Sequence, residues 1–220
     1  MCIRDRNIPI TTLSHVAANN LNVDIVIDGV DEIDPDLQMS KGGSGCLLRE
    51  KMIESAATKV VIVADESKLT TQLGTGHPLS IEITPFSHEH LRKSIEQLPS
   101  FYGNARVILR RGQASSNASD GSEIAVTDNG HYIIDVYFAK PIHDVKRAAA
   151  ELDNLTGIVE HGICVNMNPI VLIASNSDKD IRVASNSHGQ ESWWSNLPIK
   201  QPLDRISLDN RQPEDFIEDE

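Results

Sequence analysis

Two short β-branched runs, separated by a helix-like segment, limit the folds open to this chain. Residues 23–27 and 59–64 are rich in Val and Ile, and the runs are followed by Asp28 and Asp65. Between them, apolar residues in 47–58 recur at the spacing of a helix packed on a sheet. Strand, helix and strand in this order predict a parallel pair with a right-handed crossover. We therefore expect an open α/β sheet of the Rossmann-like type here.

The strand pattern changes after residue 77. Shorter strands alternate with two helices in the order β-α-β-β-α-β, which is that of a ferredoxin-like α+β sandwich. The expected strands are 79–84, 106–110, 132–138 and 157–165, and the expected helices are 87–98, with Ser87 as N-cap, and 143–152. The predicted fold class is thus α/β, with a parallel β-α-β (Rossmann-like) sheet domain and a ferredoxin-like α+β domain.

These patterns divide the chain into four parts. Residues 1–77 would form a partial Rossmann-like domain, and 78–165 the ferredoxin-like domain. The apolar strand in 166–175 is expected to return to the first domain. Residues 176–220 are polar and acidic without apolar periodicity, which predicts a disordered tail. Residues 1–6 read like a translated sequencing-library adapter, so we expect them to be an artefact and the true start to lie upstream.

Composition disfavours several classes of protein. The net charge of -12 disfavours nucleic-acid binding, because the phosphate backbone is bound by clustered Lys and Arg. Cys2, Cys46 and Cys164 form no C-x-x-C pair and have no His at zinc-ligand spacing, which predicts a reducing compartment and no metal site. No apolar run reaches the roughly 18 residues that cross a bilayer. We expect a cytoplasmic protein with no nucleic-acid or membrane partner, and leave an organellar location and a homo-oligomer open.

Charged loops follow both strands of the β-α-β unit. In an open parallel sheet, ligands bind beyond the carboxyl ends of the strands, where Asp28 and Asp65 lie. The glycine-rich stretch 41–45 leads into the predicted helix, which carries Glu50 near its first turn. Backbone N–H groups in such a loop approach an anion closely, and the helix dipole adds favourable potential. This combination predicts an anion site at one edge of the sheet.

Each of these features has a structural alternative. Asp-Gly after a strand is usually a turn, and an acid in the first helical turn usually serves the helix dipole. Lys41 and Lys68 taken alone would be surface lysines. The glycine run matches neither the dinucleotide-binding nor the P-loop motif. The prediction therefore depends on the combination.

Three linked motifs carry a resemblance to a known family. They are DGVDEID at 28–34, KGGSGCLLREK at 41–51 and DESK at 65–68. In order and spacing they resemble the motifs of ribose-5-phosphate isomerase type A. Weaker similar stretches are 78–85, 126–130 and 157–162. The resemblance covers about residues 7–175.

The chain departs from this family pattern in two ways. Val30 stands where the family usually has Ala, and Ser44 where it has Gly; both changes are small enough for the loops to survive. The family's N-terminal helix, first strand and Gly-Thr-Gly-Ser-Thr type phosphate loop have no counterpart here. We therefore expect an N-terminally truncated fragment with weak activity or none.

The resemblance implies an aldose–ketose isomerase that interconverts ribose 5-phosphate and ribulose 5-phosphate, in the pentose phosphate pathway, without a cofactor or metal. Such a reaction needs a base that moves a proton between C1 and C2, and donors that stabilise an enediolate oxygen. The resemblance implies Glu50 as the base, and Lys41 with the Gly42 and Gly43 amides as the donors.

It also implies that Asp28 and Asp31 handle sugar hydroxyls and ring opening, and that Lys68 contacts a hydroxyl or the phosphate. The implied catalytic residues are Glu50, Lys41 and Asp28, and the implied substrate-binding residues are Asp28, Gly29, Asp31, Lys41, Gly42, Gly43 and Lys68. The only implied partner is a small-molecule sugar phosphate.

Two other interpretations stay open. The effector domains of some bacterial transcription regulators resemble this isomerase fold and bind sugar phosphates without turning them over; such a protein should also carry a helix-turn-helix segment. The second interpretation is that the chain is an inert fragment of an isomerase gene.

His88 and His90 lie two residues apart on a predicted helix, so their rings point apart. This spacing favours a surface pair over a metal site.

Overall fold

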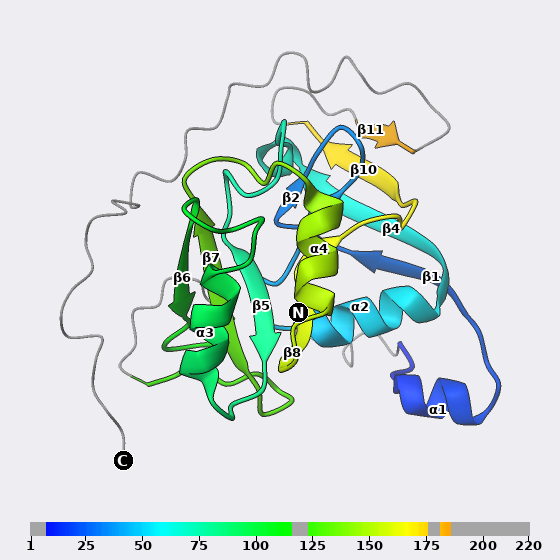
Figure 1. The fold of residues 1–220 in the computed structure, drawn as a ribbon. Helices are drawn as coiled ribbons and strands as arrows, with labels where there is room; N and C mark the ends of the chain where they lie inside the picture. Colours follow the sequence, from blue (N-terminus) through cyan, green and yellow to red (C-terminus); the bar gives the residue numbers. More distant parts are fainter. Residues whose placement is uncertain (1–7, 116–122, 176–180, 186–220) are drawn as a thin grey trace.

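The computed structural model describes residues 8–115, 123–175 and 181–185 (Figure 1). Its helices are α1 (Leu13–Ala18), α2 (Leu47–Ala56), α3 (His88–Glu96) and α4 (Val145–Asp153), with a 3-10 turn, η2 (Glu66–Lys68). Its strands are β1 (Val23–Asp28), β2 (Glu32–Ile33), β3 (Met39–Ser40), β4 (Ala57–Asp65), β5 (Leu79–Ile83), β6 (Ala105–Leu109), β7 (Tyr132–Phe138), β8 (Ile158–His161), β9 (Ile163–Cys164), β10 (Ile170–Ala174) and β11 (Ile181–Ala184). None of the helices in these ranges is both long and apolar enough to cross a membrane.

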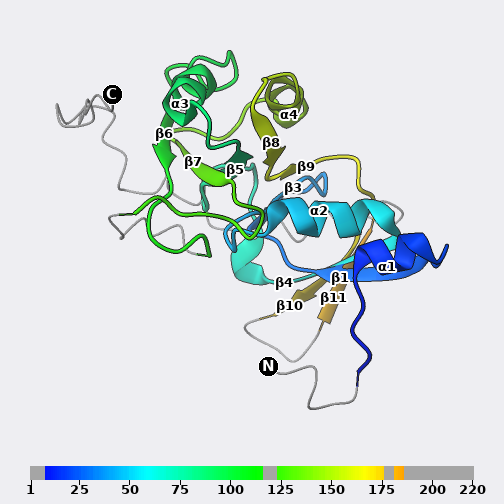
Figure 2. The ribbon, with the colours of Figure 1, turned by 90° about the horizontal axis from the view of Figure 1, so that it is seen from below.

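The first sheet has the strand order β1-β4-β10-β11. β1 and β4 are parallel, and α2 connects them, so the predicted β-α-β unit is confirmed. β10 lies parallel to β4 on its other side, which confirms that the strand at 170–174 returns to this sheet. Figure 2 shows α2 lying across β1 and β4, on the side that faces β8. The carboxyl end of β1 and the start of α2 therefore lie near the second sheet.

The second sheet is antiparallel, with the order β6-β7-β5-β8. This is the order of a ferredoxin-like sandwich, as predicted, and Figure 2 shows α3 and α4 on the same face of it. Buried side chains from the sheet and both helices form one apolar cluster, to which Ile81, Ile95, Val136 and Leu152 belong. The fold class expected from the sequence is thus confirmed.

A small third sheet, β2-β3-β9, joins the two larger ones and was not predicted. The segment 157–165, expected to be one strand, divides at Gly162 into β8 and β9, which pair in different sheets. The Gly162 amide donates to the carbonyl of Ser80 at 2.8 Å, and its carbonyl accepts from the amide of Lys41 at 2.8 Å. A Cβ on Gly162 would overlap the Lys41 carbonyl oxygen. The glycine is required because two backbones meet there.

Three local expectations were wrong. Residues 181–184, placed in an unstructured tail, form β11, because an alternating Ile-Arg-Val-Ala segment pairs with the edge of β10; residues 176–180 and 186–220 lie outside the described part. Ser87 precedes α3 but is left-handed, with φ of 54°, and its side chain makes no capping bond. The helix expected from residue 143 begins at Val145, because the Asp144 side chain accepts from the Arg147 amide.

Candidate active site

The ammonium group of Lys41 is the centre of the candidate site. Lys41 follows β3, and its side chain is only 2% exposed. Its Nζ atom donates to Asp28 Oδ2 at 2.6 Å and to the carbonyl oxygen of Gly29 at 2.7 Å. Asp28 ends β1, so the structure brings the glycine-rich loop to the carboxyl end of that strand. The sequence had predicted this edge of the sheet as the ligand site.

Helix α2 adds two carboxylates on the same side of Lys41. Glu50 Oε2 lies 3.7 Å from Lys41 Nζ, and Glu54 Oε1 lies 3.0 Å from it. The two acids are four residues apart, so they share one face of the helix. The Glu54 side chain is fully buried, whereas that of Glu50 is 24% exposed. Sequence reasoning missed Glu54, although its spacing from Glu50 was a signal that could have found it.

Burial and neighbouring charges shift the pKa values of these groups in opposite directions. Burial raises the pKa of Glu50 above its ordinary value of 4.5, and the Lys41 charge only partly offsets this. Burial likewise raises the pKa of Glu54, again against the charge of Lys41. For Lys41 itself, burial acts to lower the pKa, but the hydrogen bond to Asp28 and the Glu54 charge outweigh it, so the pKa is raised. Lys41 thus stays charged, and both glutamates bind protons more readily than exposed ones.

Ser44 is a second residue that sequence reasoning missed. Its hydroxyl donates to Glu50 Oε1 at 3.1 Å. This hydrogen bond leaves Glu50 Oε2 on the side of Lys41. The residue that departs from the family's usual Gly therefore orients the predicted base.

Asp31 lies on the other side of the glycine-rich loop. Its Oδ2 atom accepts from the Gly43 amide at 2.8 Å and lies 3.6 Å from His77 Nδ1. A Cβ on Gly43 would come within 3 Å of both the His77 ring and the Asp31 carboxylate, so a larger residue would displace these two side chains. The Gly43 amide, expected to face an oxyanion, is occupied by Asp31 in this structure.

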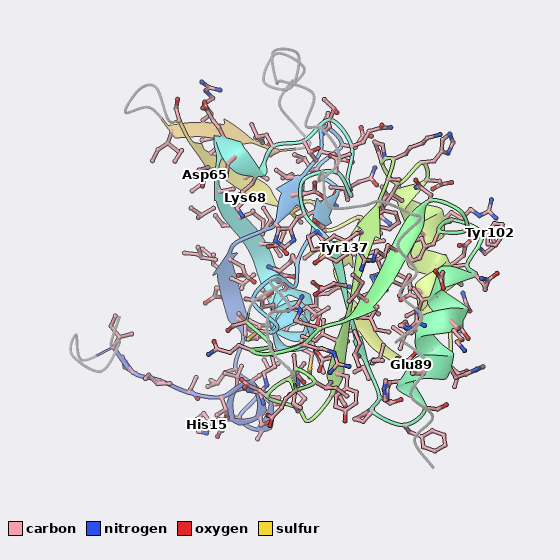
Figure 3. The ribbon with its side chains drawn as sticks, turned by 90° about the vertical axis from the view of Figure 1, so that its left-hand side faces the viewer. His15, Asp65, Lys68, Glu89, Tyr102 and Tyr137 are labelled. Atoms are coloured by element: carbon pink, nitrogen blue, oxygen red, sulfur yellow. The ribbon has the colours of Figure 1, made fainter. Side chains whose placement is uncertain are left out.

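Lys68, also predicted as a site residue, is not bonded to the residues described above. Within the described ranges, its Nζ atom forms no hydrogen bond or ion pair with Asp28, Asp31 or Glu50. Asp28 is paired with Ile62, so β4 continues three residues beyond the end of β1, about 10 Å at the rise of a strand. Figure 3 shows Lys68 beside Asp65 at that far end of β4. The residue after Lys68, Leu69, forms a parallel bridge with Ile33, so the 3-10 turn that carries Lys68 lies beside the segment that follows Asp31.

The chemistry open to this arrangement is proton transfer beside a fixed positive charge. A half-buried carboxylate with a raised pKa is suited to act as a general base near neutral pH. A buried ammonium stabilises negative charge that develops on a substrate oxygen. No group of three or more His, Cys, Asp or Glu side chains in the described part of the chain could hold a metal ion.

Comparisons with known proteins agree with this chemistry. A family model described as ribose 5-phosphate isomerase A (phosphoriboisomerase A) matches residues 1–178. A ribose-5-phosphate isomerase of Plasmodium falciparum is 38% identical over 172 residues, which are 78% of this chain and 67% of that protein. Ribose-5-phosphate isomerase A of Rhizobium meliloti is 41% identical over 152 residues, 69% of this chain and 62% of that protein. The chain thus spans about two thirds of the length of these relatives.

Solved structures give the same result. The ribose 5-phosphate isomerase of Plasmodium falciparum superposes with a TM-score of 0.74 and 35% identity, covering 84% of this chain and 73% of that one. A D-ribose-5-phosphate isomerase in complex with phospho-erythronic acid gives a TM-score of 0.70 at 28% identity, covering 83% and 72%. None of these comparisons supports the alternative of a transcription regulator.

Proposed function

Because this chain belongs to the ribose 5-phosphate isomerase A family, we propose that the protein interconverts ribose 5-phosphate and ribulose 5-phosphate through an enediolate, with Glu50 as the base. The observation that supports this most directly is the position of Glu50. Its carboxylate is partly exposed, is oriented by the hydroxyl of Ser44 and lies 3.7 Å from the buried ammonium of Lys41.

In this proposal, Glu50 removes the proton on C2 of the open-chain aldose and returns it to C1. The electron pair of the broken C–H bond forms the C1–C2 double bond of the enediolate, and negative charge moves onto the C1 oxygen. As C1 is protonated and the C2 carbonyl forms, the proton of the C2 hydroxyl passes to the C1 oxygen, which becomes the C1 hydroxyl of the ketose. The raised pKa of Glu50 brings its basicity closer to that of a catalyst working near pH 7.

Lys41 stabilises the enediolate oxygen. An ammonium group has three N–H donors, and Lys41 Nζ donates to two acceptors, Asp28 Oδ2 and the Gly29 carbonyl. Its contact with Glu54 is an ion pair in which neither carboxylate oxygen of Glu54 has a hydrogen bond to any part of the chain that the structure describes. The remaining N–H group is the one proposed to bind the enediolate oxygen, and burial strengthens this interaction because a charge acts more strongly where water is excluded.

Asp28 and Asp31 are proposed to hold the sugar hydroxyls and assist ring opening, since both carboxylates are partly exposed beside the glycine-rich loop. We propose Gly29, Gly42 and Gly43 as backbone contacts to the substrate. Lys68, in the 3-10 turn η2 that follows β4, is proposed as a contact for the far end of an extended five-carbon substrate.

Proton exchange tests this function directly. The purified protein is incubated with ribose 5-phosphate in D₂O, and the products are followed by NMR. We expect ribulose 5-phosphate to appear with deuterium at C1, because the enediolate is protonated from a base that exchanges with solvent. Loss of the C2 proton without the ketose, or binding without either change, would contradict the proposal and favour a ligand-binding role.

A further inference from the structure

A buried arginine of the second sheet makes contact with the glycine-rich loop. Arg110 directly follows β6 and is fully buried. Its Nε and Nη2 atoms donate to the two carboxylate oxygens of Asp135, on β7, at 2.8 and 2.6 Å. Nη2 also donates to the hydroxyl of Ser80, on β5, at 2.7 Å. The charge of Arg110 is thus fully compensated within the second sheet.

Arg110 also donates hydrogen bonds to backbone carbonyls outside that sheet. Both Nη1 and Nη2 donate to the carbonyl of Gly42 at 3.3 Å, and Nη1 also donates to the carbonyl of Gly43 at 3.4 Å. Nη1 has another acceptor in the carbonyl of Ala114. These are long contacts, but a fixed guanidinium holds two successive carbonyls at once. Arg110 itself is fixed by backbone hydrogen bonds with Ile133 and Ala125.

The geometry of the peptide bond carries this constraint to the active site. In a trans peptide, the C=O and N–H groups point in opposite directions. The carbonyl of Gly42 and the amide of Gly43 belong to one peptide plane, so holding the carbonyl on Arg110 directs the amide towards Asp31. The next peptide plane contains the carbonyl of Gly43, which Arg110 also holds, and the amide of Ser44. The contact with Arg110 therefore also positions Ser44, and the hydroxyl of Ser44 orients Glu50.

We propose that Arg110, held by Asp135, is a positioning residue for the isomerase reaction, and that it acts by fixing the Gly42–Gly43 and Gly43–Ser44 peptide planes. The proposal rests on the proposed function, because it concerns the orientation of groups that face the enediolate. Arg110 does not touch the substrate, since its side chain is fully buried and its contacts are with protein groups.

The test compares Arg110→Lys with the unaltered protein. Lysine keeps the charge opposite Asp135 but has no planar fork to bind two sets of acceptors. We expect kcat for ribose 5-phosphate to fall roughly ten- to hundredfold, with KM changed by less than about threefold, because misplaced groups cost most in the transition state. We also expect faster hydrogen exchange at the Gly43 amide, measured by NMR.

Val107→Ala serves as the matched control. Val107 is buried in the same strand, β6, so the change lowers stability without removing a contact to the loop. At a temperature well below its melting point, we expect this variant to keep kcat and the exchange rate at Gly43. If Arg110→Lys matched Val107→Ala in both measurements, Arg110 would serve stability only and the proposal would be wrong.

A second variant covers the case in which Arg110→Lys does not fold. The pair Arg110→Met with Asp135→Leu removes both charges together, which buried ion pairs tolerate far better than the loss of one partner. The same fall in kcat and the same faster exchange are expected. If the unaltered protein shows no isomerisation at all, the proposed function fails, and exchange at Gly43 still decides whether Arg110 holds the loop.

Discussion

The Nζ atom of Lys41 lies 3.0 Å from Oε1 of Glu54, a carboxylate whose side chain is fully buried. A lone buried carboxylate is costly, so this contact is the main compensation for the charge of Glu54. Neither carboxylate oxygen of Glu54 has a hydrogen-bond partner in the described residues, so the compensation is that of an ion pair. Glu54 therefore belongs to the site electrostatically, whether or not it ever meets the substrate.

Replacing Glu50 by Gln removes the proposed base and keeps the shape of the side chain. We expect kcat to fall by roughly two or more orders of magnitude, since general base catalysis is lost. Binding of a ribose 5-phosphate analogue, measured by calorimetry, should stay within a few-fold of the unaltered protein. Glu96→Gln, on a 43% exposed side chain of α3, is the control and should keep full activity. Near-normal turnover of the Glu50 variant would exclude it as the base.

Replacing Glu54 by Gln should move the acidic limb of the kcat profile to lower pH. The negative charge of Glu54 disfavours a second negative charge on the same side of Lys41, so its removal lowers the pKa of Glu50. We expect a shift of roughly half a unit to one unit. Glu160→Gln is the matched control, because Glu160 pairs with a different lysine, Lys51 on α2, at 2.6 Å. If the acidic limb of the kcat profile stayed at the same pH, Glu54 would be protonated and neutral over the pH range of that limb.

Asp34 provides a test of stability that does not depend on function. Burial raises the pKa of Asp34 from 3.8 to about 6. The folded state therefore binds this proton more tightly, and its contribution to stability is lost as the pH rises from about 4 to about 6, by at most roughly 3 kcal/mol.

Asp34→Asn should remove this loss, because the amide oxygen still accepts from the Asp36 and Gln38 amides. In urea unfolding, we expect the variant to be about 1–3 kcal/mol more stable than the unaltered protein at pH 7.5, with the difference vanishing near pH 4. Asp24→Asn, at an exposed position of β1, should show no such trend, whereas Asp36 is unsuitable as a control because its charge contributes to the raised pKa of Asp34. A gain that is equal at both pH values would contradict the assignment.

Cys46 and Cys164 should differ strongly in their reaction with iodoacetamide. Burial raises the pKa of Cys164 to about 12, whereas Cys46 is exposed and its pKa is raised less. Alkylation requires the thiolate and access to it. At pH 8 we expect Cys46 to react at least roughly a hundredfold faster in the native protein, and the two to become comparable in urea. Peptide mass spectrometry follows each residue; equal native rates would contradict the burial of Cys164.

The larger elements could be predicted because their sequences carry a strong period. The β-branched runs of β1 and β4, and the apolar runs of β5, β7 and β10, are long enough to indicate strands without knowledge of their partners. The strands β2, β3 and β9 have two residues each, which is too short for any alternation to be visible. They exist because of their tertiary pairing.

The candidate site was predictable where a loop motif brings the residues together, and not where packing does. Asp28, Lys41 and Glu50 lie in motifs at the ends of elements, and their proximity follows from the parallel sheet. The spacing of Glu54 from Glu50 indicates a shared helix face, but an acid within a helix is usually solvated, and the burial of Glu54 is visible only in the fold. The position of Lys68 depends on the relative lengths of β1 and β4 and on the pairing of Leu69 with Ile33, which no local pattern determines.

Gly162 makes one region of this protein intolerant to mutation for reasons unrelated to chemistry. Any side chain there would overlap the carbonyl of Lys41, and its own hydrogen bonds tie Lys41 to Ser80. In a saturation library screened for growth or turnover, substitutions at position 162 should therefore be lost as completely as those at Glu50. Screening the same library for abundance separates the two positions, because Gly162 variants disappear from both selections while Glu50→Gln persists as folded protein.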